Sequence, residues 1–253
     1  MEVRPPNVYN NAMSTGIFGT IITTPLYNGL IGLMQVFPWA DLGLAVIFFT
    51  ILVRLILFPL AQASLRTQMV VQKVQPEIDA LREKYKDNSA EQAKMMMELY
   101  RREKINPFAS IFFLGIQIPI IFGLYFMFLR SGLPVINPDF LYSFLSPDVH
   151  INTIFLGFID VTVKSIPIAI LAGLSQFIQV RLMKTPQTQG KEGSFGADFM
   201  KGMQFQMKYI FPVIIIFIAS ALPASIALYW TTSNIFSIAQ EAYIRKRLAE
   251  KKD

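Results

Sequence analysis

Arg54 is the residue whose position in this sequence most requires a chemical explanation. It lies inside an apolar run that begins at Leu42, which places it about 18 Å along an α-helix. An arginine at the middle of a membrane span costs roughly 2.5–3.5 kcal/mol on insertion scales unless water or a partner solvates it. The long apolar runs offer no interior Asp or Glu to pair with it. We therefore expect a hydrated site that is lined by neutral polar groups.

Neutral polar side chains on several apolar runs are candidates for that lining. Thr50 lies one helical turn before Arg54, and the others lie on three further runs: Gln117, Gln176, Gln179, Ser233 and Asn234. Each of them taken singly is better explained as an interhelical hydrogen bond. An unpaired cation in a poorly screened medium attracts anions. The chemistry that we expect is thus the binding of an acidic polypeptide segment or of an anionic solute, without bond making or breaking.

The residue inventory excludes several other classes of site. There is no cysteine, and the one histidine, His150, lies in a Pro- and Asp-containing segment that is typical of a solvated loop. Disulfides, thiol nucleophiles and Cys/His zinc sites are therefore ruled out. An intramembrane hydrolase lacks its nucleophile, its base and a Gly-x-Ser-x-Gly elbow. We predict a protein that is not an enzyme and that uses no cofactor and no metal.

Three consecutive methionines, Met95, Met96 and Met97, are a second candidate binding feature and lie within a charged segment. Methionine is flexible and polarizable, and it is favoured at surfaces that accept varied apolar partners. Packing between two helices explains the run equally well. Three consecutive positions cannot all face one partner helix, so we expect at least one of them to be exposed.

The elements that must position these residues are membrane helices. The 253 residues are 53% hydrophobic and only 16% charged, with a mean hydropathy of +0.44, and the apolar residues gather into blocks of roughly the length that crosses a bilayer. The sequence predicts an all-α integral membrane protein with five transmembrane helices around a hydrophilic groove. An N-terminal interfacial helix and a cytosolic helical hairpin complete it.

The expected segments follow from where the apolar blocks stop. The five spans are 42–65, 107–129, 164–183, 203–221 and 223–243. Residues 1–41 form an extracytoplasmic N-terminus with an interfacial amphipathic helix, whose apolar face is Leu26, Leu30, Leu33 and Phe37. The connecting segments are the charged hairpin 66–106, the extracytoplasmic loop 130–163, the cytosolic loop 184–202 and the basic tail 244–253. In the hairpin, Ser89 with Gln92 predicts a capping box that opens the second helix.

The distribution of basic residues predicts the orientation. Nineteen Lys and Arg residues lie in the hairpin, the second loop and the tail, against three on the opposite side. Basic residues concentrate in cytosolic loops. We therefore expect the hairpin, the 184–202 loop and the C-terminus in the cytosol and the N-terminus outside.

Several runs in this order resemble the YidC family of membrane protein insertases. They are Gly43–Ile47 with Arg54–Leu60, Gln72–Ile78, Asn106-Pro107 with Gln117–Ile120, Phe211-Pro212, and Pro223–Asn234. Each run is a weak motif, but together, with a charged hairpin between the first two spans, they are specific. The resemblance covers about residues 20–245. It is to the short form, without the large extracytoplasmic domain, the lipoprotein cysteine or a long tail.

The resemblance implies a hydrophilic groove that opens to the cytosol and to lipid. The family's groove arginine matches Arg54, with Thr50, Gln117 and Gln176 or Gln179 as polar companions. The family's client-contacting aromatic matches Tyr229 or Trp230. The hairpin would receive clients. The implied partners are nascent membrane proteins and membrane lipids, and the Sec translocon, the signal recognition particle pathway and the ribosome are further candidates. Specific DNA binding is not expected.

The predicted function is insertion of nascent proteins into the bacterial cytoplasmic membrane, without ATP, through a groove that contains Arg54. The alternative is an anion transporter or channel that uses Arg54 as its binding residue. We find no inverted repeat between the halves of the chain, and a transporter has no evident use for the hairpin. Uptake of a solute into liposomes would separate the two functions.

Overall fold

The computed structural model describes residues 17–106, 115, 119–128, 133–182, 202 and 205–250. Helices dominate this part of the chain, which confirms the predicted all-α class. The elements are η1 (Gly19–Thr23), α2 (Thr24–Val36), α3 (Leu42–Ile56), α4 (Phe58–Lys84), α5 (Ser89–Arg102), η2 (Pro138–Phe140), β1 (Ile154–Phe155), β2 (Ile159–Asp160), α7 (Ile166–Leu182), η3 (Gln206–Ile210), α9 (Phe211–Ala221) and α10 (Ala224–Glu250), with a further helix at Pro119–Phe128.

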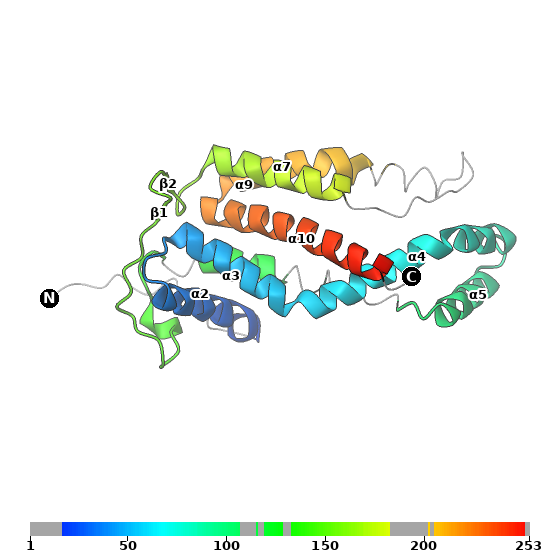
Figure 1. The fold of residues 1–253 in the computed structure, drawn as a ribbon, viewed down its shortest axis with the longest axis horizontal. Coiled ribbons are helices and arrows are strands. Elements are labelled where there is room, and N and C mark those ends of the chain that lie inside the picture. The colour runs from blue at the N-terminus through cyan, green and yellow to red at the C-terminus, as the bar shows by residue number, and fades with distance from the viewer. Residues whose placement is uncertain are drawn as a thin grey trace.

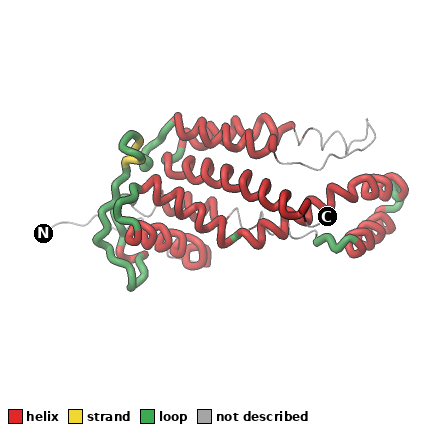
Figure 2. The backbone as a smooth tube through the Cα atoms, viewed as in Figure 1, coloured by secondary structure: helices red, strands yellow, loops and turns green. Residues whose placement is uncertain are grey.

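The main helices lie side by side along the long axis of the molecule (Figure 1). α10 is central, since it packs against α7 and against α3, while α9 packs on α7 and α2 packs on α3. The pair α4–α5 extends beyond one end of this bundle. Loops and the antiparallel β1–β2 pair lie at the opposite end (Figure 2).

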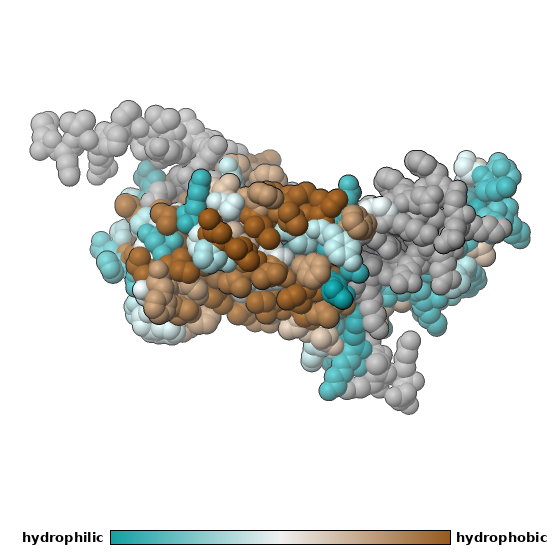
Figure 3. All heavy atoms as spheres, turned by 90° about the horizontal axis from the view of Figure 1, so that it is seen from above, coloured by the Kyte–Doolittle hydropathy of each residue, from teal (hydrophilic) through white to brown (hydrophobic). Residues whose placement is uncertain are grey.

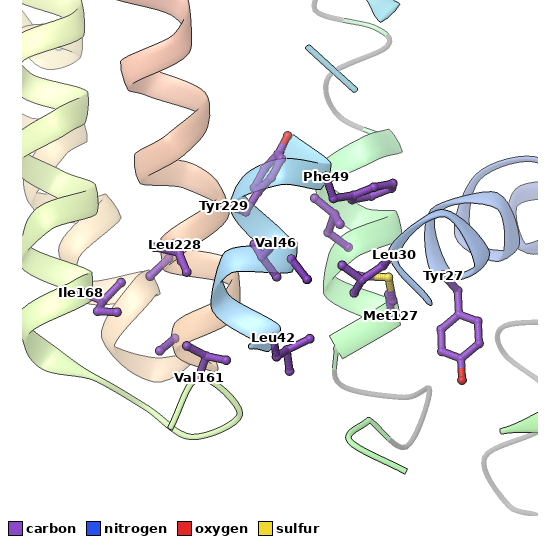
Figure 4. Packing of buried hydrophobic residues seen from close by; sticks show 14 of the residues in the cluster. Tyr27, Leu30, Leu42, Val46, Phe49, Met127, Val161, Ile168, Leu228 and Tyr229 are labelled. Atoms are coloured by element: carbon purple, nitrogen blue, oxygen red, sulfur yellow. The ribbon is translucent and has the colours of Figure 1, made fainter. Parts of the chain in front are cut away.

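A single apolar core joins the bundle near its loop-covered end. Leu30 of α2, Leu42 and Val46 of α3, Ile168 of α7 and Leu228 of α10 all belong to this cluster, and each is buried (Figure 4). Close packing also depends on glycine. A Cβ added at Gly173 of α7 would lie 2.9 Å from the main-chain oxygen of a proline on α9, so these two helices touch through their backbones.

The region predicted as one spanning helix, 42–65, belongs to a bent pair of helices. Asp41 caps α3 by accepting a hydrogen bond from the Leu44 amide at 2.8 Å. α3 then ends at Ile56, and α4 starts in a direction that differs by 61°. Pro59 lies in the first turn of α4, where its missing N–H costs nothing but where it blocks continuation of the preceding helix. The break brings Arg54 into the last turn of α3.

The helices α4 and α5 form a hairpin with its own small core. Val74, Ile78, Leu99 and Ile105 are buried between them. The helix α5 begins at Ser89, one residue earlier than a Ser89 N-cap predicts, and its N-cap is Asn88, whose side chain accepts from the Glu91 amide at 3.1 Å. The predicted capping box is therefore wrong by one residue, because Asn88 reaches the third amide of the helix first.

The helix α2 buries a different face from the one that the sequence predicts. Tyr27, Leu30, Ile31 and Met34 are almost fully buried, whereas of the predicted face only Leu30 is. The reason is tertiary packing: α2 lies against α3, and Asn28 is fixed by hydrogen bonds with residues 140 and 142, in the segment that precedes β1. The helix is thus part of the folded bundle.

No single helix within the described ranges is both long and apolar enough to cross a membrane. One bent pair passes that test by length and composition, namely α3 with α4, and three shorter apolar helices lie at Pro119–Phe128, Ile166–Leu182 and Gln206–Ala221. The surface of the bundle is largely hydrophobic on the face that Figure 3 shows, with hydrophilic residues gathered toward the ends. Large apolar side chains of the bundle are exposed, for example Leu171 of α7 and Phe217 of α9.

Some predicted features lie outside the described residues. They include residues 1–16, Gln117, most of the predicted span 107–129, nearly all of the 184–202 loop, and the last three residues of the tail.

Candidate functional site

Arg54 reaches across from α3 to α10. Its Nε donates to the Ser233 hydroxyl oxygen at 3.0 Å, and its Nη2 donates to the same oxygen. The side chain is half-buried. In the described chain Arg54 makes no ion pair with a carboxylate. The guanidinium is therefore a charge held by a neutral group, with donors left over because arginine carries five N–H groups.

Arg54 lies in the last turn of α3, one turn after the buried Thr50. Thr50, one turn earlier, is buried and donates its hydroxyl to the Val46 carbonyl at 2.6 Å, so its hydroxyl bonds to its own helix. Arg54 also sits at the C-terminus of α3, where the helix dipole stabilises a cation by roughly 0.3–1 kcal/mol. The position suits a permanent positive charge.

Tyr229 and Trp230 lie one turn before Ser233 on α10. Tyr229 is 4% exposed and belongs to the core cluster, while Trp230 is partly buried and packs against it. Figure 4 shows the ring of Tyr229 beside α3. Tyr229 therefore belongs to the packed core between α10 and α3, whereas Trp230 retains some exposed surface.

Asn234 ties α10 to α7. Its Nδ2 donates to the Ser175 hydroxyl oxygen at 3.0 Å, and both side chains are buried. Ser175 in turn donates to the Ala172 carbonyl at 2.8 Å. Gln176, the next residue of α7, is half-buried. The polar groups near Arg54 thus connect three helices, with α10 in the middle.

A cavity of about 80 Å³ lies where α4, α7 and α10 meet. It is lined by side chains from all three helices: Ala61, Ser64, Leu65, Gln68, Gln179, Ser237, Gln240, Glu241 and Ile244. Ser233 and Ser237 are four residues apart on α10, and Ser237 donates to the Ser233 carbonyl at 2.8 Å. The part of α10 that lines the cavity thus begins one helical turn after Ser233.

The structure brings together only some of the groove residues that the sequence predicts. Arg54 and Ser233 are in contact, Gln179 lines the cavity, and Asn234 instead bonds to α7. The sequence interpretation missed five polar residues that face the cavity, namely Ser64, Gln68, Ser237, Gln240 and Glu241. The helical period could have identified three of them. Ser237, Gln240 and Glu241 follow Ser233 by four, seven and eight residues, which places all of them on the same face of one helix.

The α4–α5 hairpin offers a separate surface. Met96 packs against the hairpin core, Met95 is half-buried, and Met97 is 47% exposed. Arg102 of α5 donates to Glu77 of α4 at 2.5 Å, which holds the two helices together. Hydrogen bonding to Glu77 raises the pKa of Arg102.

Comparison with known proteins places this chain among membrane proteins. A family model described as "60Kd inner membrane protein" matches residues 33–252. The protein named membrane protein insertase YidC of Nitrobacter hamburgensis is 30% identical over 239 residues, which cover 89% of this chain and 37% of that protein. Its namesake in Herminiimonas arsenicoxydans is 32% identical over 231 residues, covering 90% and 37%.

A third relative is similar over still more of the chain. The membrane protein insertase YidC of Pelobacter propionicus is 31% identical over 241 residues, which cover 95% of this chain and 41% of that protein. The chain thus spans about two fifths of the length of the curated relatives that it matches.

Proposed function

Because this chain belongs to the 60Kd inner membrane protein family, we propose that it is a membrane protein insertase of the YidC type. It integrates apolar segments of newly made proteins into the bacterial cytoplasmic membrane. Three relatives that carry this activity in their names share 30–32% of their residues with it over most of its length. The groove mechanism below rests on the chain's own residues.

The observation that carries the mechanism is the contact between Arg54 and Ser233. A hydrogen bond to a charged group contributes roughly 1.5–3 kcal/mol, more than one between neutral groups. A client carboxylate accepts from arginine with both of its oxygens, which a single hydroxyl cannot do. The Ser233 hydroxyl can therefore be exchanged for a carboxylate of the client's hydrophilic segment, which carries a charge and accepts through two oxygens.

The proposed topology is the one that the charges predict. Five segments cross the membrane, with the N-terminus outside and the α4–α5 hairpin and C-terminus in the cytosol. Apolar side chains exposed on α7 and α9, such as Leu171, Ile178 and Phe217, suit contact with lipid. The hairpin segment 66–106 carries nine Lys and Arg residues, which suits the cytosolic side.

Insertion then follows a short path. The client meets the hairpin first, where Met97 offers an adaptable apolar contact. Its polar segment next enters between α3 and α10 and pairs with Arg54, which shortens the hydrophobic distance to be crossed. Its apolar helix moves sideways into lipid along the first, second and fifth spans. Burial of roughly 20 apolar residues in the bilayer drives the step, so no ATP is needed.

The proposed partners are nascent membrane proteins and lipids. The Sec translocon, the signal recognition particle pathway and the ribosome are candidates for delivering clients, and they can be tested by omitting each from a purified system.

The test is reconstitution of the purified chain into liposomes. A short single-span client is added, and its translocated tail is scored by protection from protease. We expect protection that requires the protein. Equal protection in empty liposomes would refute the proposal. Uptake of a small anion without any client insertion would favour an anion transporter that uses Arg54.

A further inference from the structure

Aromatic side chains meet where the end of α7 lies against η3. Gly173 lets α7 and α9 touch through their backbones. One turn further along α7, the ring of Phe177 lies 6.3 Å from that of Tyr209, measured between the ring centroids, and the exposed ring of Phe205 lies 5.0 Å from that of Tyr209. These three rings form a surface cluster at the end of the bundle that lies away from β1 and β2 (Figure 1).

α7 and η3 each place one cation against this aromatic cluster. The guanidinium carbon of Arg181 lies 5.9 Å from the centre of the Phe177 ring, and the ammonium nitrogen of Lys208 lies 5.5 Å from that of Tyr209. A cation this close to an aromatic ring is attracted by its π electrons. Within the described ranges neither cation forms an ion pair with a carboxylate. The cluster therefore presents two positive charges that no described carboxylate neutralises.

The backbone at Lys208 is also unusual. η3 is a π turn, which closes with a hydrogen bond from the Phe211 amide to the Gln206 carbonyl. The next residue, Pro212, has no N–H that could bond to the Lys208 carbonyl as it would in an α-helix. Single π turns are rare and frequently occur at functional sites. The local geometry thus favours a function at this point of the chain.

Large apolar side chains surround the two cations. Ile178 and Leu182 of α7 are exposed, and so are Ile210 and Ile214 across the contact with η3 and α9. Arg181 follows Ile178 by three residues, so the two lie on the same face of α7. The surface is therefore an exposed apolar strip that ends in two positive charges.

An anionic phospholipid matches both parts of this surface. Its phosphate accepts hydrogen bonds from arginine and lysine, and its acyl chains cover exposed aliphatic side chains. Basic sites between membrane helices are typical places for acidic headgroups. An RNA strand would also bring phosphates, and its bases stack on aromatic rings. It would leave the aliphatic side chains in contact with water, however, so the observations favour a lipid.

We propose that Arg181 and Lys208 bind the phosphate of one anionic phospholipid, whose acyl chains lie along Ile178, Leu182 and Ile210. The inference requires that the chain lies in a membrane and does not depend on the insertase mechanism proposed above. α7 is also bonded to α10, through Ser175. A lipid that holds the end of α7 against η3 therefore stabilises the folded bundle by binding to it.

The test measures binding of phosphatidylglycerol to the purified, delipidated chain in detergent by native mass spectrometry, with phosphatidylcholine as the lipid without net charge. A basic residue near an acidic headgroup contributes about fivefold in affinity. We therefore expect Arg181→Gln combined with Lys208→Gln to weaken phosphatidylglycerol binding roughly thirtyfold and to abolish the preference over phosphatidylcholine. The matched control is Arg66→Gln combined with Lys73→Gln, which removes the same charge from exposed positions of α4. This control should bind phosphatidylglycerol as the wild type does.

Competitors identify the source of the phosphate. Soluble glycerol phosphate and a short RNA should not displace the lipid, because neither covers the apolar strip. Displacement by either of them, an equal loss in the α4 control, or a wild type without preference for phosphatidylglycerol would overturn the lipid site. The wild-type arms need no variant, so they decide the question even where a variant unfolds.

Thermal unfolding supplies a second readout. Phosphatidylglycerol should raise the unfolding temperature of the wild type and of the α4 control, and not that of the variant without Arg181 and Lys208. An equal rise in all three would overturn the proposal. None of these measurements involves a client, so their failure leaves the insertase function standing, and failure of insertion in liposomes leaves the lipid site standing.

Discussion

Replacing Arg54 tests whether its charge acts on the client or only on the fold. Arg54→Gln keeps a side chain that can hydrogen-bond to Ser233 across α3 and α10 but removes the charge. At an effective dielectric constant of about 20, two charges 4 Å apart interact by about 4 kcal/mol. Part of this is offset because the carboxylate must leave water.

A charged hydrogen bond is worth roughly 1.5–3 kcal/mol net, which corresponds to about a ten- to a hundredfold change in rate or affinity. We therefore expect Arg54→Gln to lower insertion of a client with an acidic tail by about ten- to a hundredfold. Insertion of a client with an uncharged tail should change by no more than about twofold. Arg54→Lys, which keeps the charge but loses the forked geometry, should be intermediate.

The assay is protease protection in liposomes, at low and at high salt. The matched control is Arg66→Gln, which removes one exposed arginine from α4. Thermal unfolding in detergent shows whether each variant is folded. Equal losses for the acidic and the uncharged client, or the same loss in Arg66→Gln, would refute the electrostatic role of Arg54.

Three further predictions concern the fold that holds the site. Asn234→Leu removes the buried hydrogen bond to Ser175 and leaves the Ser175 hydroxyl with only its intrahelical contact. We expect the free energy of unfolding to fall by about 1–3 kcal/mol, as measured by denaturant titration. An unchanged titration midpoint would contradict this expectation. Gly173→Ala should destabilise by about 1–3 kcal/mol because its Cβ meets the α9 backbone, whereas Gly115→Ala, with nothing within 4 Å, should not. Asp160 accepts from the hydroxyl and amide of the threonine two residues on, which lowers its pKa. The contribution of the Asp160 carboxylate to folding stability is therefore full above about pH 4 and is lost as the pH falls through the lowered pKa of the folded state. Amide hydrogen exchange in the β1–β2 turn should become faster only in that acidic range. Exchange protection that stays constant through it would refute this.

The candidate site shows which of its features residue patterns can predict. Arg54 could be identified from the sequence because a charge within an apolar run is costly whichever helices that run packs against. Its contact with Ser233 could not, because 179 residues separate the two and several polar residues competed as partners. Gln240 and Glu241 were missed for a similar reason: they lie near the end of the fifth apolar run, where polar residues are expected in any case.

The sequence by itself determined the all-α class, the resemblance to an insertase family, the charged hairpin and the importance of Arg54. These depend on composition, on the period of a single helix and on ordered motifs, all of which are local properties of the chain. Only the tertiary structure decided which face of α2 is buried, where α3 gives way to α4, and which polar groups meet around α10. Those features depend on which helices pack together, and many pairings satisfy the same local pattern. Close packing of particular side chains, such as Gly173 against α9, selects one of them.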